Sequence, residues 1–496
     1  MMTRSATWAA FGILLTGLAI ASASEPLPRA EPEAMGVSSA AVLDFIREAD
    51  DIDSFHGVML VRHGKVVAEG WWAPYDAETR HALFSLSKSF TSTAVGLAAA
   101  EGKLSVDDPV LKFLPDDAPA DPSPHLKAMR ISDLLRMSTG HHDEPKRPED
   151  QAWTKVFLAH PVPSKPGTHF LYNTSATYMA SAIVQKATGQ TVRDYLRPRL
   201  FDPLGIDDPE WGTSPQGVSL GGYGLSIRTE DIAKFGQLYL QKGRWNGRQL
   251  VPESWVEAAT ALQTSNGSNP DSDWEQGYGY QFWRSRHGAY RGDGAFGQYC
   301  VVMPEQDAVL AITSGVKDMQ AVLNLAWDKL LPGMQDAPLP ADPAARDALA
   351  RTLGGLTMKT PRGSAEPAAS VNAFDRAFRF EPNDQKLESL SLERGGAGEG
   401  SLTLVLRSDG RESRVPCGRG EWTKSRAALR GPAEQSVAAS AAWTADDELT
   451  ARVVLVETPF HVTYRIKFEA GKATVHPEAN VAFGPTRSAA LTSEAE

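Results

Sequence analysis

A serine and a lysine separated by two residues are the first pair in this sequence that could do chemistry. Ser85-Leu86-Ser87-Lys88 opens a segment rich in Ala, Ser and Leu. In a helix, positions i and i+3 share one face, so the Lys88 amine would reach the Ser85 hydroxyl. A serine is a poor nucleophile until a base takes its proton, and a lysine in a dry pocket is neutral enough to act as that base. The pair predicts covalent catalysis through Ser85.

A tyrosine is the third candidate. Tyr172 lies just after a Pro166-Gly167 turn and just before a predicted helix. Its phenol could relay protons between Lys88, Ser85 and a leaving group. Taken alone, however, Tyr172 is better explained as a buried tyrosine that makes a single hydrogen bond.

Four motifs, in order, resemble the β-lactamase-related serine hydrolases. They are residues 84–90 (FSLSKSF), 101–109 (EGKLSVDDP), 131–140 (ISDLLRMSTG) and 166–168 (PGT) with Tyr172. That superfamily includes class C β-lactamases, D,D-peptidases, D-aminopeptidases, several esterases and 6-aminohexanoate-dimer hydrolases. The resemblance covers about residues 31–331. It implies that Ser85 is the acylated nucleophile, that Lys88 is its base or keeps Tyr172 ionised, and that Tyr172 relays protons.

Two motifs depart from the pattern of this family. The second motif is commonly Tyr-x-Asn, whereas here Asn173 and Thr174 follow Tyr172. We expect both to bind substrate, although the usual amide position is occupied by threonine.

The third motif is commonly Lys-Thr-Gly or His-x-Gly, and the best candidate is the run YRGDG at residues 290–294. Here the resemblance implies an oxyanion hole formed by the backbone N–H of Ser85 with that of Gly292 or Asp293. Tyr290 and Arg291 are the expected substrate-binding side chains, and Arg291 could hold a carboxylate.

The residues named above must be positioned by helices and strands. The sequence predicts both kinds of element over residues 24–331, which indicates an α+β domain. The resemblance implies a β-lactamase-like fold, in which an antiparallel sheet is flanked by helices and joined to a helical subdomain. The residue patterns predict a hairpin and two further strands, and three helices, the first of them buried. The strands are expected at 58–61, 66–68, 298–303 and 308–313, and the helices at 85–100, 175–188 and 229–241.

The two ends of the chain differ in composition from this domain. Residues 1–23 combine Arg4, an apolar run and small residues, which predicts a signal peptide and a secreted or periplasmic chain without a membrane anchor. Residues 332–354 begin with a Pro-, Ala- and Asp-rich stretch that indicates a linker. Residues 355–496 predict a small C-terminal β domain that ends in a disordered tail.

Composition excludes several classes of function. The 50 Lys+Arg against 61 Asp+Glu give a formal charge of -11, which argues against nucleic acid as a partner. The only cysteines, Cys300 and Cys417, are expected to be separate thiols and cannot form a thiolate zinc site. No zinc-protease, thiol-redox or P-loop motif occurs, so we expect no metal and no cofactor. The expected partner is a small ester or amide; the oligomeric state is left open.

Three other motifs are weaker candidates. Ser314-Gly315-Val316-Lys317 repeats Ser-x-x-Lys at a strand end, and residues 217–221 (GVSLG) match a hydrolase elbow around Ser219 without the required strand and helix. His141-His142-Asp143-Glu144 is better explained as a polar loop than as a metal site. An aromatic-rich stretch from Trp274 to Tyr290 is expected to lie mostly in the core, with one or two rings at the cleft.

These observations predict a serine hydrolase that cleaves an ester or amide. Two alternatives stay open. One is a D,D-peptidase or β-lactamase on the same fold, and the other is a catalytically silent ligand-binding protein.

Overall fold

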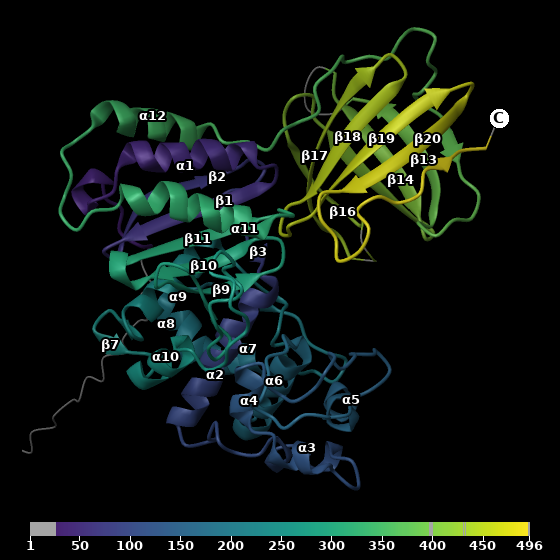
Figure 1. Cartoon of the computed structure of the whole chain (residues 1–496). Helices are drawn as coiled ribbons and strands as arrows, with labels where there is room; N and C mark the ends of the chain where they lie inside the picture. The colour runs from purple at the N-terminus through teal and green to yellow at the C-terminus, as the bar shows by residue number, and fades with distance from the viewer. Residues whose placement is uncertain (1–25, 396–399, 430, 432, 495–496) are drawn as a thin grey trace, which may run out of the picture.

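A six-stranded antiparallel sheet forms the centre of the domain that holds Ser85, Lys88 and Tyr172, which is expected to carry the chemistry and is called the catalytic domain below (Figure 1). The computed structural model describes residues 26–395, 400–429, 431 and 433–494; the predicted signal peptide lies outside them. The strand order is β2-β1-β11-β10-β9-β8. The strands are β1 (Phe55–Arg62), β2 (Lys65–Trp71), β8 (Trp283–Arg284), β9 (Tyr290–Gly294), β10 (Gln298–Met303) and β11 (Ala308–Ser314). Strands β10 and β11 are buried along their whole length, because helices cover both faces of the sheet.

Each face of this sheet carries its own hydrophobic cluster. One face packs against α1 (Ser39–Asp51), α11 (Met319–Leu325) and α12 (Pro343–Gly354). The other packs against α2 (Ser87–Ala100) and α9 (Thr229–Leu240). Figure 1 shows α1, α11 and α12 on one side and α2 and α9 on the other. Helix α2 is buried at every position from Ser87 to Ala98, as its apolar composition predicts.

A helical subdomain surrounds α6 (Thr174–Thr188), which packs against α2. The remaining helices of the catalytic domain are α3 (Pro124–Ala128), α4 (Ile131–Leu135), α5 (Trp153–Ala159), α7 (Val192–Leu196), α8 (Asp202–Leu204) and α10 (Glu253–Thr260). Two small sheets complete it, formed by β3 (His81–Ala82), β4 (Glu210–Trp211) and β5 (Leu225–Ile227), and by β6 (Arg244–Trp245) and β7 (Arg248–Gln249). None of the described helices is long and apolar enough to cross a membrane.

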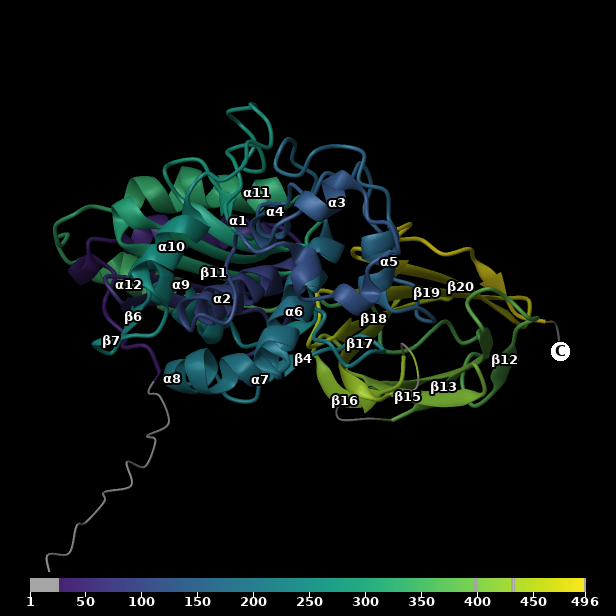
Figure 2. The same ribbon diagram turned by 90° about the horizontal axis from the view of Figure 1, so that it is seen from below.

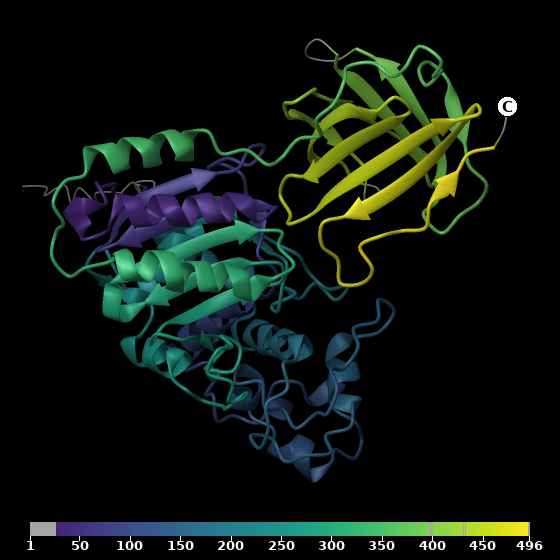
Figure 3. The same cartoon turned by 45° about the horizontal axis from the view of Figure 1, so that its top comes forward.

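The C-terminal domain consists of two antiparallel sheets (Figure 3). The four-stranded sheet contains β12 (Ala377–Arg379), β13 (Leu387–Arg394), β14 (Leu402–Ser408) and β15 (Arg411–Cys417). The six-stranded sheet contains β16 (Thr423–Ala427), β17 (Gln435–Ala445), β18 (Glu448–Leu455), β19 (His461–Glu469), β20 (Lys472–Ala479) and β21 (Leu491–Thr492). Their inward-facing residues form one hydrophobic cluster. Figures 1 and 2 show this domain beside the catalytic domain.

Two predicted segments differ from the structure. The linker expected at 332–354 contains α12, which packs on α1 and β2. Leu349 and Leu353 give this helix an apolar face that joins the hydrophobic cluster beneath α1. The tail expected to be disordered forms β21, which pairs with β20; residues 495–496 lie outside the described residues. Cys300 and Cys417 are both buried free thiols, as expected.

Candidate active site

Ser85 and Lys88 are brought together at the start of α2. Ser85 lies on a single 3-10 turn, Phe84–Leu86, that leads directly into the helix. Lys88 follows one turn later, and its Nζ lies 2.9 Å from Ser85 Oγ. The lysine is 1% exposed, so its amine is held in a dry environment. The pair has the geometry that a serine nucleophile and its base require.

Lys88 Nζ has two further partners. It lies 2.9 Å from the carbonyl oxygen of Gly222 and 3.2 Å from Thr174 Oγ1. A carbonyl oxygen can only accept, so one N–H donates to Gly222. A neutral amine has two N–H groups and one lone pair. As an ammonium, Lys88 donates to all three oxygens; as a neutral amine that donates to Gly222 and Thr174, it keeps its lone pair for the Ser85 hydroxyl.

Burial lowers the pKa of Lys88 to about 7. The cost of placing an ammonium in a low-dielectric site is the main cause. Arg147 lowers the pKa further, whereas Glu144 and Asp293 oppose the shift. A substantial fraction of Lys88 is therefore neutral at neutral pH, which suits a general base.

Tyr172 completes the group. Lys88 Nζ lies 4.9 Å from the centre of its ring. Desolvation and the neighbouring Asp293 raise the pKa of the phenol, although the nearby Ser85 hydroxyl opposes this. The raised pKa favours the protonated phenol, and this favours Lys88 as the base over an ionised Tyr172. Trp283 stacks on the tyrosine ring at 5.3 Å, which places one residue of the aromatic stretch at the site.

The two residues after Tyr172 make contacts within the protein that the sequence did not predict. Asn173 is fully buried, and its Oδ1 accepts from the backbone N–H of Ala176 at 3.0 Å, so its side chain caps α6. Thr174 binds Lys88 through its hydroxyl. Both contacts fix the start of α6 against the nucleophile, and the expected binding of substrate by these two residues stays a prediction.

Strand β9 lies directly against the segment that carries Ser85. A Cβ atom added at Gly292 would lie 2.4 Å from Leu86 Cδ1, and one added at Gly294 would lie 2.0 Å from the carbonyl oxygen of Leu83. Only glycine permits this approach. Gly292 and Asp293, the expected oxyanion-hole donors, therefore belong to the strand that faces the nucleophile, and their role stays a prediction.

Arg291 is placed differently from the sequence expectation. It is fully buried, and its Nη2 lies 2.9 Å from Asp293 Oδ2. Its Nη1 donates to Ser285 Oγ at 2.7 Å and to the carbonyl oxygen of Asp273 at 2.8 Å. The guanidinium is thus committed to protein partners instead of a substrate carboxylate. Tyr290 is also buried, with its ring packed against Phe282 in the core.

The weaker candidates have structural roles. Ser314 Oγ donates to the carbonyl oxygens of Phe296 and Gly297, at 2.9 and 2.8 Å. Ser219 lies in a loop, where a bridge joins it to Thr213. His141 is buried and bonds Thr139. Within the described ranges, no group of three or more His, Cys, Asp or Glu residues could hold a metal ion.

The sequence analysis did not predict the contact of the Thr174 hydroxyl with Lys88. It also missed two contributors to the site, the Gly222 carbonyl and the nearby pair formed by Glu144 and Arg147. The glycine run at 221–222 was the available signal for Gly222, because a Cβ there would lie 2.6 Å from Thr174 Cγ2.

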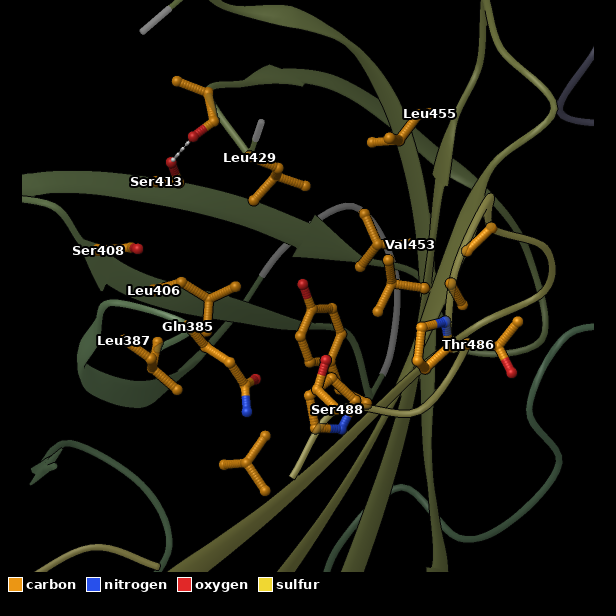
Figure 4. A pocket seen from close by; sticks show the side chains of 18 residues that line it. Gln385, Leu387, Leu406, Ser408, Ser413, Leu429, Val453, Leu455, Thr486 and Ser488 are labelled. Atoms are coloured by element: carbon orange, nitrogen blue, oxygen red, sulfur yellow. Dashed lines mark hydrogen bonds between the residues drawn. The ribbon is translucent and has the colours of Figure 1, made fainter. Parts of the chain in front are cut away.

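A cavity of about 350 Å³ lies in the C-terminal domain (Figure 4). Leu387, Leu406, Val453 and Leu455 contribute to its apolar wall, and its polar groups are neutral, such as Ser413, which donates to the Ala428 carbonyl at 3.0 Å. None of its lining residues is acidic or basic. It therefore lacks a base for a serine nucleophile, unlike the Ser85 site.

Comparison with known proteins identifies the family. The Beta-lactamase family matches residues 44–366. The chain is 26% identical over 335 residues to 6-aminohexanoate-dimer hydrolase from Paenarthrobacter ureafaciens, which covers 63% of this chain and 85% of the relative. It is 28% identical over 156 residues to lovastatin esterase from Penicillium rubens, covering 26% of this chain and 39% of that protein.

A solved structure shares the fold. It is described as "Putative 6-aminohexanoate-dimer hydrolase from Bacillus anthracis" and superimposes with a TM-score of 0.50 at 20% identity, covering 62% of this chain and 87% of the other. The family match spans the helices and strands that position Ser85, Lys88 and Tyr172. This chain therefore belongs to the Beta-lactamase family of serine hydrolases.

Proposed function

We propose that this protein is a secreted serine hydrolase that cleaves a carboxylic ester or amide through an acyl-enzyme on Ser85. One observation carries the proposal: Lys88 Nζ lies 2.9 Å from Ser85 Oγ while its other contacts are to Gly222 and Thr174. That arrangement directs the amine lone pair to the hydroxyl proton.

The reaction has two halves. Ser85 Oγ attacks the substrate carbonyl carbon while its proton passes to Lys88 Nζ. Backbone N–H groups of Ser85 and of β9 stabilise the oxyanion. The C–O or C–N bond then breaks, and the leaving group takes a proton from Tyr172, which is replenished from Lys88. Water attacks the acyl-enzyme, gives its proton to Lys88 and releases the acid, and Ser85 recovers its proton.

The buried Arg291 favours neutral substrates. Hydrolysis of β-lactams and D,D-peptides requires recognition of a carboxylate, and the guanidinium that could supply it is fully buried against Asp293. Two of the relatives are named as a dimer hydrolase and an esterase, which supports amide and ester chemistry. We therefore rank ester or amide hydrolysis above the β-lactamase and D,D-peptidase alternatives.

Labelling with a fluorophosphonate tests the nucleophile. We expect covalent modification of wild type, mapped to the peptide that contains Ser85, and none in Ser85→Ala. Ser219→Ala is the matched control and should label and hydrolyse a p-nitrophenyl ester at the wild-type rate. Modification at Ser219, or a folded wild type that is neither labelled nor active, would reject the proposal, the latter in favour of a ligand-binding protein.

Export is a separate part of the proposal. It is based on the apolar run at residues 9–20 and the small residues that follow it. Expression in a bacterial host followed by N-terminal sequencing should find a mature chain that begins at Ser24. A cytoplasmic, uncleaved chain would contradict export without affecting the chemistry.

A further inference from the structure

Four phenylalanine rings from two domains meet beside the nucleophile. Phe84 directly precedes Ser85, and Phe296 lies in the turn after β9. Phe460 and Phe483 come from the C-terminal domain. Their ring centres lie 5.7 Å apart for Phe84 and Phe296, 6.0 Å for Phe84 and Phe460, and 4.9 Å for Phe296 and Phe483. We call this cluster the aromatic wall.

The backbone is strained at both catalytic-domain members of the aromatic wall. Phe84 has φ of 47° and Phe296 has φ of 68°. Bulky residues rarely adopt positive φ, and such strain persists where the surrounding structure imposes it and is concentrated at functional sites. Glycine would relieve the strain at either position. Phenylalanine at both therefore indicates that the rings themselves are used.

The other two rings are held in place by contacts between the domains. The carbonyl oxygen of Thr458 accepts from Tyr75 Oη at 2.8 Å. Asn480 clamps the two segments that carry Phe460 and Phe483. Its Nδ2 donates to the carbonyl oxygens of Pro459 and Gly315, each at 2.8 Å, and its Oδ1 accepts from the backbone N–H of His461 at 2.8 Å. The position of the C-terminal domain relative to Ser85 is thus fixed by specific hydrogen bonds.

Part of the aromatic wall faces solvent. Phe483 is 77% exposed, although it contacts both Phe84 and Phe296. Phe84, Phe296 and Phe460 are each only partly buried. An exposed apolar cluster of this kind marks a binding surface. The residue after Phe84 is the nucleophile, so the aromatic wall begins one residue from Ser85.

We propose that the aromatic wall is a substrate subsite, and that it selects neutral esters or amides carrying an alkyl chain or an aromatic ring next to the scissile bond. This rests on the proposed function of Ser85. The C-terminal domain would then supply two specificity-determining residues, Phe460 and Phe483, to the active site of the catalytic domain. The apolar group could lie on the acyl or on the leaving-group side of the scissile bond, and the two substrate series below distinguish them.

The test measures kcat/KM with two series of substrates. p-Nitrophenyl acetate and octanoate vary the acyl group, and ethyl and benzyl butyrate vary the alcohol. Phe483→Ala should lower kcat/KM for the longer member of one series by about tenfold, with less than a twofold change for the shorter member. Phe483→Leu should recover part of the loss. Phe374→Ala, which removes a ring in the same domain that packs on Trp443, should leave the ratio unchanged.

Binding separates this proposal from that of hydrolysis. Calorimetry with the octanoate ester and the benzyl ester on Ser85→Ala measures the subsite without turnover. Weaker binding of one of them in Ser85→Ala/Phe483→Ala than in Ser85→Ala supports the aromatic wall even if Ser85 proves not to be the nucleophile. If Ser85→Ala and Ser85→Ala/Phe483→Ala bind each ester with equal affinity, the proposal is overturned. An equal loss of kcat/KM for long and short substrates in Phe483→Ala would also overturn it, whether or not Ser85 is the nucleophile.

Discussion

At the scale of single residues, the site depends on two groups whose pKa values shift in opposite directions. Burial lowers the pKa of Lys88 and raises that of Tyr172. Both shifts favour the neutral form, because a low-dielectric site disfavours charge of either sign. A neutral amine can accept a proton and a neutral phenol can donate one. The same physical cause therefore assigns the base and the acid.

The pH profile should report Lys88. With a neutral ester, kcat/KM is expected to rise with pH through about 7, since the amine is active only after losing its proton. Lys88→Arg should lose about 10²–10⁴-fold in kcat/KM, because a guanidinium stays protonated. Tyr172→Phe, as a comparison, should keep a midpoint near that of wild type. A flat profile between pH 6 and 8 would contradict the role of Lys88 as base.

Lys88 and Tyr172 should act as one unit. Lys88 contacts Ser85, the Tyr172 ring lies beside Lys88, and a proton passes between the two residues in the proposed cycle. Lys88→Ala and Tyr172→Phe are each expected to remove most of the turnover, and the double variant should lose far less than the product of the two losses. The check is kcat for all four proteins of the cycle. Fully multiplicative losses would mean that Tyr172 serves only to pack against Trp283.

At the scale of elements, contacts between distant segments hold the lysine in position. The start of α6 provides Thr174, and the loop before β5 provides Gly222. The Gly222 position tolerates no side chain, as a Cβ would lie 2.6 Å from Thr174 Cγ2 and 3.5 Å from Lys88 Nζ. Helix α6, the loop before β5 and α2 are therefore packed so closely around Lys88 that an added methyl group does not fit.

Gly222→Ala should disturb catalysis more than folding. The added methyl would displace Thr174 or Lys88, and a displacement near 1 Å costs roughly 10²-fold in rate. Gly354→Ala is the matched control, because nothing lies within 4 Å of the added atom. Circular dichroism and kcat/KM should show two folded proteins, of which only Gly222→Ala is impaired. Equal activity would show that the loop can shift without effect on Lys88.

Local sequence patterns predicted much of this arrangement, whereas contacts between residues far apart in the sequence were not predicted. The hairpin, the buried helix and the strands at 298–303 and 308–313 follow from short-range periodicity, and the Ser85 to Lys88 contact needs only one helical turn. Thr174 and Gly222 reach Lys88 from 86 and 134 residues away. No spacing rule links such positions. Helix α12 was missed because the Pro- and Asp-rich stretch before it resembles a linker, while its packing on α1 depends on tertiary structure.

At the scale of the whole molecule, the two domains share one interior. Ala438, Val454 and Val456 of the C-terminal domain belong to the same hydrophobic cluster as α1 and β11 of the catalytic domain. Gly315 allows a close approach of the two domains, since a Cβ there would lie 2.1 Å from the carbonyl oxygen of Pro459. The two domains are therefore packed against each other and not merely linked by the chain. This packing is the reason that the aromatic wall can include rings from both domains.

Three buried histidines lie at this junction. His56 Nδ1 and His81 Nε2 are 3.0 Å apart, and His56 stacks on Tyr75 at 3.9 Å. His461 Nδ1 lies 3.4 Å from Ser54 Oγ. Burial lowers the pKa of His81 and of His461 to about 4, with Arg452 adding to the shift at His461 and Asp53 opposing it. Burial also lowers the pKa of His56. All three are neutral in the folded protein at neutral pH.

Acidification should therefore destabilise the folded chain before most carboxylates titrate. Between about pH 6.5, the usual pKa of an unfolded histidine, and pH 4, the unfolded chain binds protons that the folded chain excludes. The free energy of unfolding then falls as pH falls, by up to about 1.4 kcal/mol per pH unit for each histidine. Urea denaturation at pH 7, 6 and 5 measures this slope. His461→Gln, which removes one imidazole and leaves the carboxylates unchanged, should give a shallower slope than wild type; parallel slopes would show that His461 takes up its proton equally well in the folded and unfolded states.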